Sequence, residues 1–334
     1  MNQVAHLPAP PPARWKIIFA FALVYVSWGT TYLAIGKGVA VFPPALFGGA
    51  RLATAGFLVL CYQALSGGSL RLSSRQFAWT ILIGSLLFMG GNGLLTVGEM
   101  YVPSGVASVL VAVTPLFIAG MEMCWPRGER LTPTGWIGVF AGIAGVLLLM
   151  IPGMQNPTEF FQGGGPLLVL ASSISWSVGS FIVRHLKMPI DHLLAAGYQM
   201  AFGGLLLVIT GCALGEYRSI HLSSFNAQGV GAFFYLLVVG SLIGFVAYNW
   251  LLGHVSAPVV GTYAYVNPVV AILVGWLFNG EAITIWIVGG MIVILAGVAL
   301  VRGVGMRRAR TGPATRLADE ETVGAIAWEE DVTA

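Results

Sequence analysis

The sequence predicts an all-α integral membrane protein with ten transmembrane helices arranged as two inverted five-helix repeats. Three observations support this prediction. First, 57% of the 334 residues are hydrophobic and 9% are charged, whereas a soluble domain carries about 25% charged residues. Second, ten apolar stretches are long enough to cross about 30 Å of hydrocarbon as helices. Third, the two halves of the chain repeat each other's motifs. Helices are expected because isolated strands would leave backbone groups unpaired in lipid.

Turn signals rich in proline and glycine separate the apolar stretches. Arg14 and Lys16 precede the first stretch, which is long enough to be a retained membrane helix rather than a signal peptide. The predicted spans are residues 15–35, 43–65, 76–99, 103–124, 133–151, 165–184, 191–214, 228–252, 258–279 and 282–302.

A fourteen-residue segment occurs twice, at residues 102–115 and 255–268. The two copies read VPSGVASVLVAVTP and VSAPVVGTYAYVNP. Other motifs return in the same order in both halves: Ser27-Trp28 pairs with Ser175-Trp176, Gly49 with Gly197, and Gly56 with Gly204. Because each unit holds five helices, an odd number, the second unit must enter the membrane the opposite way up. Inverted repeats of this kind recur in secondary transporters.

Lys and Arg side chains are unequally divided between the two sides of the predicted bundle. Thirteen lie in tails and loops on the side of the N-terminus, two (Lys37 and Arg218) lie on the opposite side, and Arg51 lies within a span. The positive-inside rule therefore places both termini in the cytoplasm. The predicted regions are a disordered N-terminal tail at residues 1–14, a first repeat at 15–151, a second repeat at 165–303 and a disordered cytoplasmic tail at 304–334.

Several classes of function lack support in the sequence. A net charge of +3 and the absence of a basic face argue against nucleic-acid binding. Cys61, Cys124 and Cys212 lie far apart in apolar stretches, and we expect them to be small buried side chains without disulfide or metal bonds. The sequence contains no phosphate loop, no nucleophile–base pair and no metal-ligand spacing. We therefore expect no catalytic residue, no cofactor and no metal.

Pro115 and Pro268 end the two copies of the repeated segment and fall well inside predicted helices. A proline cannot donate a backbone hydrogen bond, so each one frees the carbonyl four residues earlier and bends its helix. In a membrane, such freed groups are tolerated where protein or cavity water satisfies them. The symmetric pair fits two hypotheses: hinges that open one side while closing the other, and static kinks.

Aromatic and amide side chains at mid-membrane are candidates for a substrate path. Trp28 and Trp176 lie near the middle of their spans, away from the headgroup belts where most membrane tryptophans lie. Asn267 shares a helix face with Tyr263. These residues fit either a cavity wall or interior packing with interhelical hydrogen bonds. The predicted substrate-binding set is Trp28, Tyr32, Asn92, Trp176, Tyr198, Gln199, Tyr248, Tyr263, Tyr265 and Asn267.

Arg51 is the only basic residue deep inside a predicted span. An unpaired charge there costs at least about 2.5–3.5 kcal/mol, so a partner is expected. Glu99, near the outer end of the third span, is the best candidate. The pair fits an outer gate, a permanent structural strut, or contacts to the carboxylate and ammonium of an amino acid. Glu122, near the inner end of the fourth span, is expected to reach the cytoplasmic interface beside Arg127.

Four motifs together resemble a known family. They are SWGTTYLAIG at residues 27–36, PPALFGGARLATAG at 43–56, VPSGVASVLVAVTPLF at 102–117, and TYAYVNPVVAILVGWLFNGEAIT at 262–284. Their order and spacing are similar to those of EamA-type carriers of the drug/metabolite transporter superfamily, over about residues 15–303. The resemblance implies a ten-helix bacterial exporter of a small metabolite. It further implies a cavity between helices 1–4 and 6–9, with helices 5 and 10 at the periphery.

On this basis we expect an inner-membrane exporter of small metabolites that works by alternating access. Trp28, Trp176, Tyr263 and Asn267 imply a neutral, aromatic cavity, which favours amino acids, especially aromatic or apolar ones, over phosphorylated cargo. The alternatives are a multidrug or general solute exporter, a channel-like pore and, from another class, an intramembrane enzyme. Proton-coupled transport and facilitated diffusion fit equally well.

The expected partners are a small-molecule substrate and the lipid bilayer, without nucleic acid. The chain fits a monomer, and it also fits a homodimer that packs through the small-residue faces of helices 5 and 10. The glycines of these two faces are Gly138, Gly142 and Gly145 in helix 5, and Gly289, Gly290 and Gly297 in helix 10.

Overall fold

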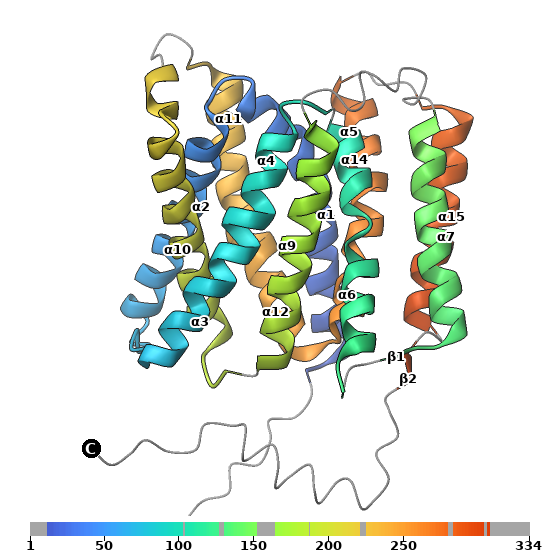
Figure 1. Ribbon diagram of the computed structural model, residues 1–334, viewed down its shortest axis with the longest axis horizontal. Coiled ribbons are helices and arrows are strands. Elements are labelled where there is room, and N and C mark those ends of the chain that lie inside the picture. Colours follow the sequence, from blue (N-terminus) through green and yellow to red (C-terminus); the bar gives the residue numbers. More distant parts are fainter. Residues whose placement is uncertain are drawn as a thin grey trace, which may run out of the picture.

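The computed structural model is a bundle of helices that run alternately up and down (Figure 1). It describes residues 12–102, 104–126, 130–151, 164–186, 188–220, 225–279, 283–303 and 306–307. The start of α1 and the last described element, β2, lie at the same end of the bundle, which we call the termini end. The other end, where α1 finishes and α2 begins, is called the far end.

Within its described residues, the first half of the chain runs through the bundle five times as helix, and two of these helical passages are interrupted. The third passage changes from α-helix to π-helix and back, and the fourth is broken by a turn at Ala112 and Val113. The elements are α1 (Arg14–Val39), α2 (Pro44–Leu65), α3 (Ser74–Gly84), η1 (Ser85–Gly93), α4 (Leu94–Gly98), α5 (Ser104–Val111), α6 (Thr114–Cys124) and α7 (Pro133–Met150).

The part of the second half that the structure describes forms five further passages, with interruptions of the same kind. Its third passage again contains a π-helical segment, and its fourth is broken by a turn at Gly261 and Thr262. The elements are α9 (Gly165–Leu186), α10 (His192–Ala213), η4 (Glu216–Ser219), α11 (Ala227–Tyr235), η6 (Leu236–Phe245), α12 (Val246–His254), α13 (Ala257–Val260), α14 (Tyr263–Asn279) and α15 (Ile285–Gly303).

The expectation of an all-helical membrane fold agrees with these elements. Among the residues that the structure describes, seven helical segments are long and apolar enough to cross a membrane. The other three predicted spans appear as the shorter apolar helices Pro133–Leu148, Tyr263–Phe278 and Ile285–Val301. One departure is a short antiparallel strand pair, in which β1 (Arg130–Leu131) lies against β2 (Met306–Arg307). β2 falls in the tail that we predicted to be disordered from residue 304, because backbone pairing with β1 orders it.

Several helices begin at side chains that cap their free backbone N–H groups. Ser73 accepts a hydrogen bond from the N–H of Gln76, and the Gln76 side chain accepts one from the N–H of Ser73, which completes a capping box at the start of α3. The Asp191 carboxylate caps α10 and Asn226 caps α11 in the same manner. These polar caps fix where each helix starts at the ends of the bundle.

The glycines repeated between the two halves bring α2 and α10 into direct backbone contact. A Cβ atom added to Gly49 would lie 2.7 Å from the backbone nitrogen of Val208, and one added to Gly56 would lie 2.6 Å from the carbonyl oxygen of Gly197. Gly204 approaches the Gly49 carbonyl equally closely. Only glycine allows this approach, which is how small residues join membrane helices. The two repeated Gly pairs therefore face each other across the interface between the halves.

The small-residue faces of α7 and α15 also pack against each other, at one edge of the bundle (Figure 1). A Cβ on Gly138 would lie 2.7 Å from the Gly297 carbonyl oxygen, and one on Gly145 would lie 2.8 Å from that of Gly290. Most of the glycines that we considered for a homodimer thus pack inside the chain, whereas Gly289 has open space beside it.

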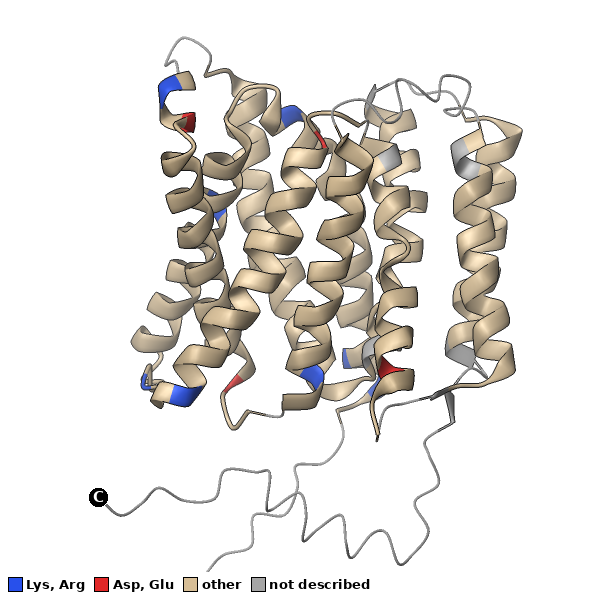
Figure 2. Cartoon of the chain, viewed as in Figure 1, with Lys and Arg blue, Asp and Glu red and all other residues tan. Residues whose placement is uncertain are grey.

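The surface between the two ends of the bundle is apolar. Lys, Arg, Asp and Glu gather at the ends, with few along the helices between them (Figure 2). Large apolar side chains such as Phe57, Phe140 and Ile292 point outward, as expected where lipid replaces water. Our expectation of buried cysteines was wrong: Cys124 and Cys212 are exposed on this surface and Cys61 is half-buried, because a thiol is apolar enough to face lipid.

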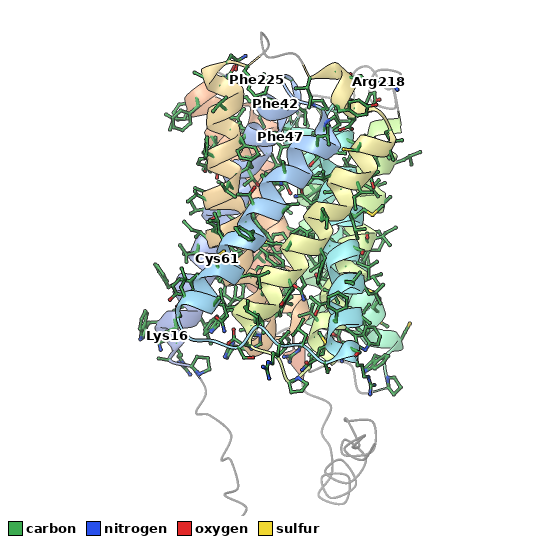
Figure 3. All side chains as sticks on the ribbon, turned by 90° about the vertical axis from the view of Figure 1, so that its left-hand side faces the viewer. Lys16, Phe42, Phe47, Cys61, Arg218 and Phe225 are labelled. Atoms are coloured by element: carbon green, nitrogen blue, oxygen red, sulfur yellow. The ribbon has the colours of Figure 1, made fainter. Side chains whose placement is uncertain are left out.

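An aromatic cluster lies at the far end of the bundle. The rings of Phe42 and Phe47 stack with centroids 5.6 Å apart, and Phe225 meets Phe42 edge-on at 4.9 Å. These residues and Arg218 lie at the end opposite Lys16 (Figure 3).

Candidate functional site

A cavity of about 80 Å³ lies inside the bundle. Since one water molecule needs roughly 10–15 Å³ by this measure, the cavity has room for several waters. Its lining comes from both halves of the chain, from α1, α2, η1, α4, α5, α6, α9, η6 and α14. The lining residues are Trp28, Thr31, Tyr32, Ile35, Arg51, Leu52, Phe88, Gly91, Asn92, Leu95, Val111, Thr114, Ser172, Ser173, Trp176, Leu236, Gly240, Ser241, Phe245, Tyr263 and Asn267.

The cavity extends from the middle of the bundle toward the far end. On α1, which starts at the termini end, the lining runs from Trp28 near the helix centre to Ile35. On α9, which runs the opposite way, it spans Ser172 to Trp176, and Trp176 is again near the helix centre. None of the lining residues within the described ranges belongs to α7 or α15, in agreement with a peripheral place for helices 5 and 10.

A layer of aromatic rings bounds the cavity at mid-depth. The Trp28 ring meets Trp176 edge-on with centroids 5.4 Å apart and Tyr263 edge-on at 4.8 Å. It also contacts Tyr248 at 4.8 Å. The indole N–H of Trp176 donates to the Tyr248 hydroxyl at 3.1 Å, and this hydroxyl also bonds Ser180. Edge-on ring pairs of this type add stability beyond their buried area, so the layer is a defined surface on the termini side of the cavity.

The two repeated Ser-Trp motifs each contact the π-helical segment of the opposite half. The indole N–H of Trp28 donates to the Gly240 carbonyl in η6 at 3.0 Å, and the Ser175 hydroxyl donates to the Leu86 carbonyl in η1 at 2.8 Å. Glycine makes both approaches possible, because a Cβ on Gly244 would lie 2.5 Å from Nε1 of Trp28, and one on Gly90 would lie 2.9 Å from Cβ of Ser175. π-helical turns are frequent at functional sites. The sequence carries no signal that we recognise for them.

Arg51 forms a polar part of the cavity wall. Its side chain is 3% exposed, and it donates from Nη1 to the Ser241 hydroxyl at 3.0 Å and from Nη2 to the Asn92 Oδ1 at 2.7 Å. Its Nε has no hydrogen-bond partner within the described part of the chain. Both acceptors are neutral, so the guanidinium charge is not neutralised by the groups it touches.

Glu99 does not pair directly with Arg51 as we expected. It is 7% exposed, and neither carboxylate oxygen has a hydrogen-bond partner among the residues that the structure describes. The two charges act on each other only through space. Glu99 follows the last turn of α4 and its Oε2 lies beside Gly36 of α1, whereas Arg51 is drawn toward η1 and η6 by Asn92 and Ser241.

The two prolines lie close to breaks in their helices. Pro115 is the second residue of α6, just after the turn at Ala112 and Val113. Pro268 lies inside α14, a turn and a half after the break at Gly261 and Thr262. The residue before Pro268, Asn267, is 1% exposed and lines the cavity beside Tyr32. Its Oδ1 has no partner in the described residues.

Four of the ten predicted binding residues do not line the cavity. Tyr198 lies on the outside of α10, where its hydroxyl donates to the Leu70 carbonyl, and Gln199 accepts a hydrogen bond from Asn249. Tyr248 contacts Trp28 and Trp176 within the aromatic layer but does not line the cavity. Tyr265 packs against α7 and α15 instead, because two residues rotate a helix by about 200° and turn it away from the face of Tyr263.

The cavity also contains residues that our sequence analysis did not single out. These are mostly small polar or aromatic side chains, including Thr31, Phe88, Ser172, Ser173, Ser241 and Phe245. The two serines could have been found, since they precede Trp176 by four and three residues and therefore share its helix face.

Glu122 differs from expectation at the termini end. Its side chain is buried, and its Oε1 lies 2.8 Å from Nε2 of His185 on α9. The predicted neighbour, Arg127, lies outside the described residues. The burial follows from the packing of α6 on α9, with Trp125 and Phe181 covering the His185 ring at 5.3 and 4.4 Å.

An apolar helical bundle with an internal cavity lined by both halves is typical of multi-pass membrane transporters. The chain belongs to the EamA-like transporter family, whose model matches residues 15–151 and 163–303. The family membership that the four motifs suggested is thereby confirmed.

Individual relatives cover most of the chain. It is 37% identical over 280 residues to the "Uncharacterized inner membrane transporter YedA" of Escherichia coli, covering 82% of this chain and 86% of that protein. It is 27% identical over 307 residues to the "Probable terminal-alkyne amino-acid exporter" of Streptantibioticus cattleyicolor, covering 90% and 99%. A solved crystal structure of a protein 22% identical to this chain shares its fold with a TM-score of 0.68, covering 87% and 97%.

Proposed function

We propose that the protein is an inner-membrane exporter of small metabolites, above all amino acids with aromatic or apolar side chains. The single observation that carries this proposal is the composition of the cavity, which joins an aromatic layer to a wall of hydrogen-bonding groups. Trp28, Trp176 and Tyr263 offer flat apolar surfaces, and Asn267 and Arg51 offer polar atoms. A small amphipathic solute needs both.

The proposed topology has ten spans, two inverted repeats and both termini in the cytoplasm. Its support is the ten helical passages, the matching π-helical segments and helix breaks of the two halves, and the positive charges of the termini side. The cavity then faces the outer half of the membrane. The relative YedA is named an inner membrane transporter, which supports the same location here.

In the proposed mechanism, the cavity is exposed alternately to the two sides of the membrane. Trp28, Tyr32, Asn92, Trp176, Tyr263 and Asn267 contact the solute. Pro115 and Pro268 act as hinges beside the breaks in the fourth and ninth passages, where fewer backbone hydrogen bonds resist bending.

Support for amino acids as substrates comes from two sources. The cavity lacks a cluster of basic residues for phosphates among its described lining, and a relative is named a "Probable terminal-alkyne amino-acid exporter". A multidrug or general solute exporter would use the same apolar surface. A channel-like pore is the alternative from another class.

An uptake panel separates these candidates. The purified full chain in proteoliposomes is offered L-phenylalanine, L-leucine, D-glucose and the cation tetraphenylphosphonium, with and without a proton gradient. We expect saturable uptake of the amino acids that is accelerated by unlabelled amino acid on the opposite side. Uptake of the cation alone would indicate a multidrug exporter. Uptake without saturation or trans-acceleration would indicate a pore.

Cysteine labelling tests the topology. With the three native cysteines replaced by alanine, Ser219→Cys at the far end and Ser74→Cys at the termini end are compared. In intact cells, a membrane-impermeant maleimide should label the first variant and not the second. The opposite pattern would contradict the proposed orientation.

A further inference from the structure

Arg51 is the one charged residue among the described residues that line the cavity, and the rest of this lining is apolar, aromatic or neutral polar. Among the described residues, no carboxylate lies within ion-pair distance of its guanidinium, and Glu99 reaches it only through space from outside the cavity wall. A buried charge is normally paired, since water cannot solvate it there. The arrangement is therefore complete only when an anionic group enters the cavity.

Resting on the function proposed above, we propose that Arg51 binds the carboxylate of the transported solute and thereby selects amino acids and related carboxylates over cations.

The hydrogen-bonding capacity of Arg51 fits this role. A guanidinium has five N–H donors, and the bonds to Ser241 and Asn92 use two of them. These two bonds hold the side chain in one orientation, so its remaining donors are fixed before a ligand arrives. A planar fork of this kind binds a carboxylate through two parallel hydrogen bonds.

The position of Arg51 in the cavity orients the solute. Its carboxylate is held where α2, η1 and η6 meet, at Arg51, Asn92 and Ser241. The side chain of the solute then has the remaining wall available, which includes the rings of Trp28 and Trp176. An acidic head group with an apolar side chain matches both surfaces.

The same charge disfavours a cationic solute. Bringing an ammonium or phosphonium into the cavity would place two like charges in a medium of low dielectric constant, where their repulsion is only weakly screened. Selectivity for carboxylates thus follows from attraction of the right ligand and from repulsion of the wrong one.

Matched ligand pairs test the proposal on the unaltered protein. Binding of L-phenylalanine, L-phenylalaninamide, 3-phenylpropanoate and phenethylamine is measured with purified protein by quenching of tryptophan fluorescence and by competition in proteoliposome uptake. L-leucine and L-leucinamide form a second pair. We expect each carboxylate to bind at least about tenfold more tightly than its amide or amine. Equal affinity of the acid and its amide in both pairs would overturn the proposal.

Variants then locate the effect at Arg51. The double variant Arg51→Met/Glu99→Gln removes both charges together, so that neither is left buried alone. It should lose the preference for acid over amide, while its affinity for the amide changes less than about threefold. Arg51→Lys, which keeps the charge without the planar fork, should retain part of the preference. Arg71→Gln, in an exposed loop, is the matched control and should behave as wild type.

The outcomes separate this proposal from the broader one. If amino acids are transported and their amides compete equally well, carboxylate recognition fails while amino-acid export stands. If 3-phenylpropanoate binds through Arg51 but no amino acid is transported, carboxylate recognition stands and amino-acid export fails. If the acid preference survives in a folded double variant, as judged by thermal unfolding in detergent, Arg51 does not carry it. If no carboxylate probe binds, both proposals fall.

Discussion

The hydroxyl of Thr114 donates to the backbone carbonyl of Val111 at 2.6 Å, which is the acceptor that Pro115 cannot serve. The first copy of the repeated segment thus satisfies the carbonyl freed by its own proline with the side chain just before it. Asn267 occupies the corresponding place in the second copy, and its Oδ1 has no partner among the described residues and lies in the cavity wall. In the first repeat the side chain at this position bonds its own backbone, whereas in the second repeat the side-chain oxygen at this position is available to a ligand.

Replacing Thr114 with valine should destabilise the protein. Thr114→Val removes the hydroxyl and leaves the buried Val111 carbonyl without that hydrogen bond, at a cost of about 1 kcal/mol. Thr80→Val is the matched control, since the buried Thr80 hydroxyl bonds the Gln76 carbonyl, which a backbone N–H already serves. Unfolding in mixed micelles should show the larger loss for Thr114→Val, and equal losses would contradict the assigned role.

Pro115→Ala and Pro268→Ala should slow transport. Each change restores a backbone donor and stiffens the helix beside its break, so the conformational step becomes slower while the cavity keeps its residues. We expect the maximal uptake rate to fall severalfold with little change in KM. Pro44→Ala, at the first turn of α2 where proline is well tolerated, should transport normally. Unchanged rates in both hinge variants would leave static kinks as the explanation.

Gly56→Ala should disturb the contact between α2 and α10. The added methyl group would meet the backbone of Gly197 and Ala201, and backbone cannot move aside without separating the helices. We expect a loss of about 1–3 kcal/mol and a lower yield of monodisperse protein. Gly231→Ala, in a helix with open space at this atom, should be neutral or slightly stabilising. Thermal unfolding of the two purified variants makes the comparison.

Trp28→Phe should weaken solute binding. The change keeps an aromatic ring but removes the indole N–H that donates to the Gly240 carbonyl in η6. It also makes the aromatic layer that bounds the cavity smaller, because a phenyl ring has less surface than an indole. A loss of about 1 kcal/mol corresponds to roughly a fivefold rise in the apparent dissociation constant. Trp286→Phe removes a half-exposed indole, 46% accessible on the outer surface, and should leave binding unchanged. If both changes raise the apparent dissociation constant equally, Trp28 contributes to the stability of the protein and not specifically to binding.

Much of the fold could be predicted because a membrane span needs only length and apolar composition. The repeated glycines were also visible, and they meet crosswise in the structure, Gly49 against Gly204 and Gly56 against Gly197. The π-helical segments were not visible, since η1 and η6 have the same apolar and small residues as ordinary membrane helices. Strand β2 could not be predicted either, because its order comes from pairing with β1, more than 170 positions earlier.

The candidate site could be predicted only where spacing fixes a helix face. Trp28, Trp176, Tyr263 and Asn267 lie on inward faces near mid-span and all reach the cavity. Tyr265, two positions from Tyr263, faces α15 instead, because which of two apolar faces points inward depends on tertiary packing. The partners of Arg51 show the same limit. Charge alone suggested Glu99, whereas the geometry of α2, η1 and η6 supplies Asn92 and Ser241.

The glycine contacts on the two flanks of the bundle constrain how a carrier of this shape can move. α2 packs against α10 with direct backbone contact, and α7 packs against α15 in the same way. Each of these two contacts joins one half of the chain to the other. If the two halves moved apart as rigid bodies, both helix contacts would have to separate and their backbone groups would become exposed to lipid. The parts that can bend more easily are then the interrupted helices that lie between these two contacts. We expect access to the cavity to change by bending of these interior helices, while the two outer helix pairs keep their positions and the cross-section of the bundle in the membrane stays nearly constant.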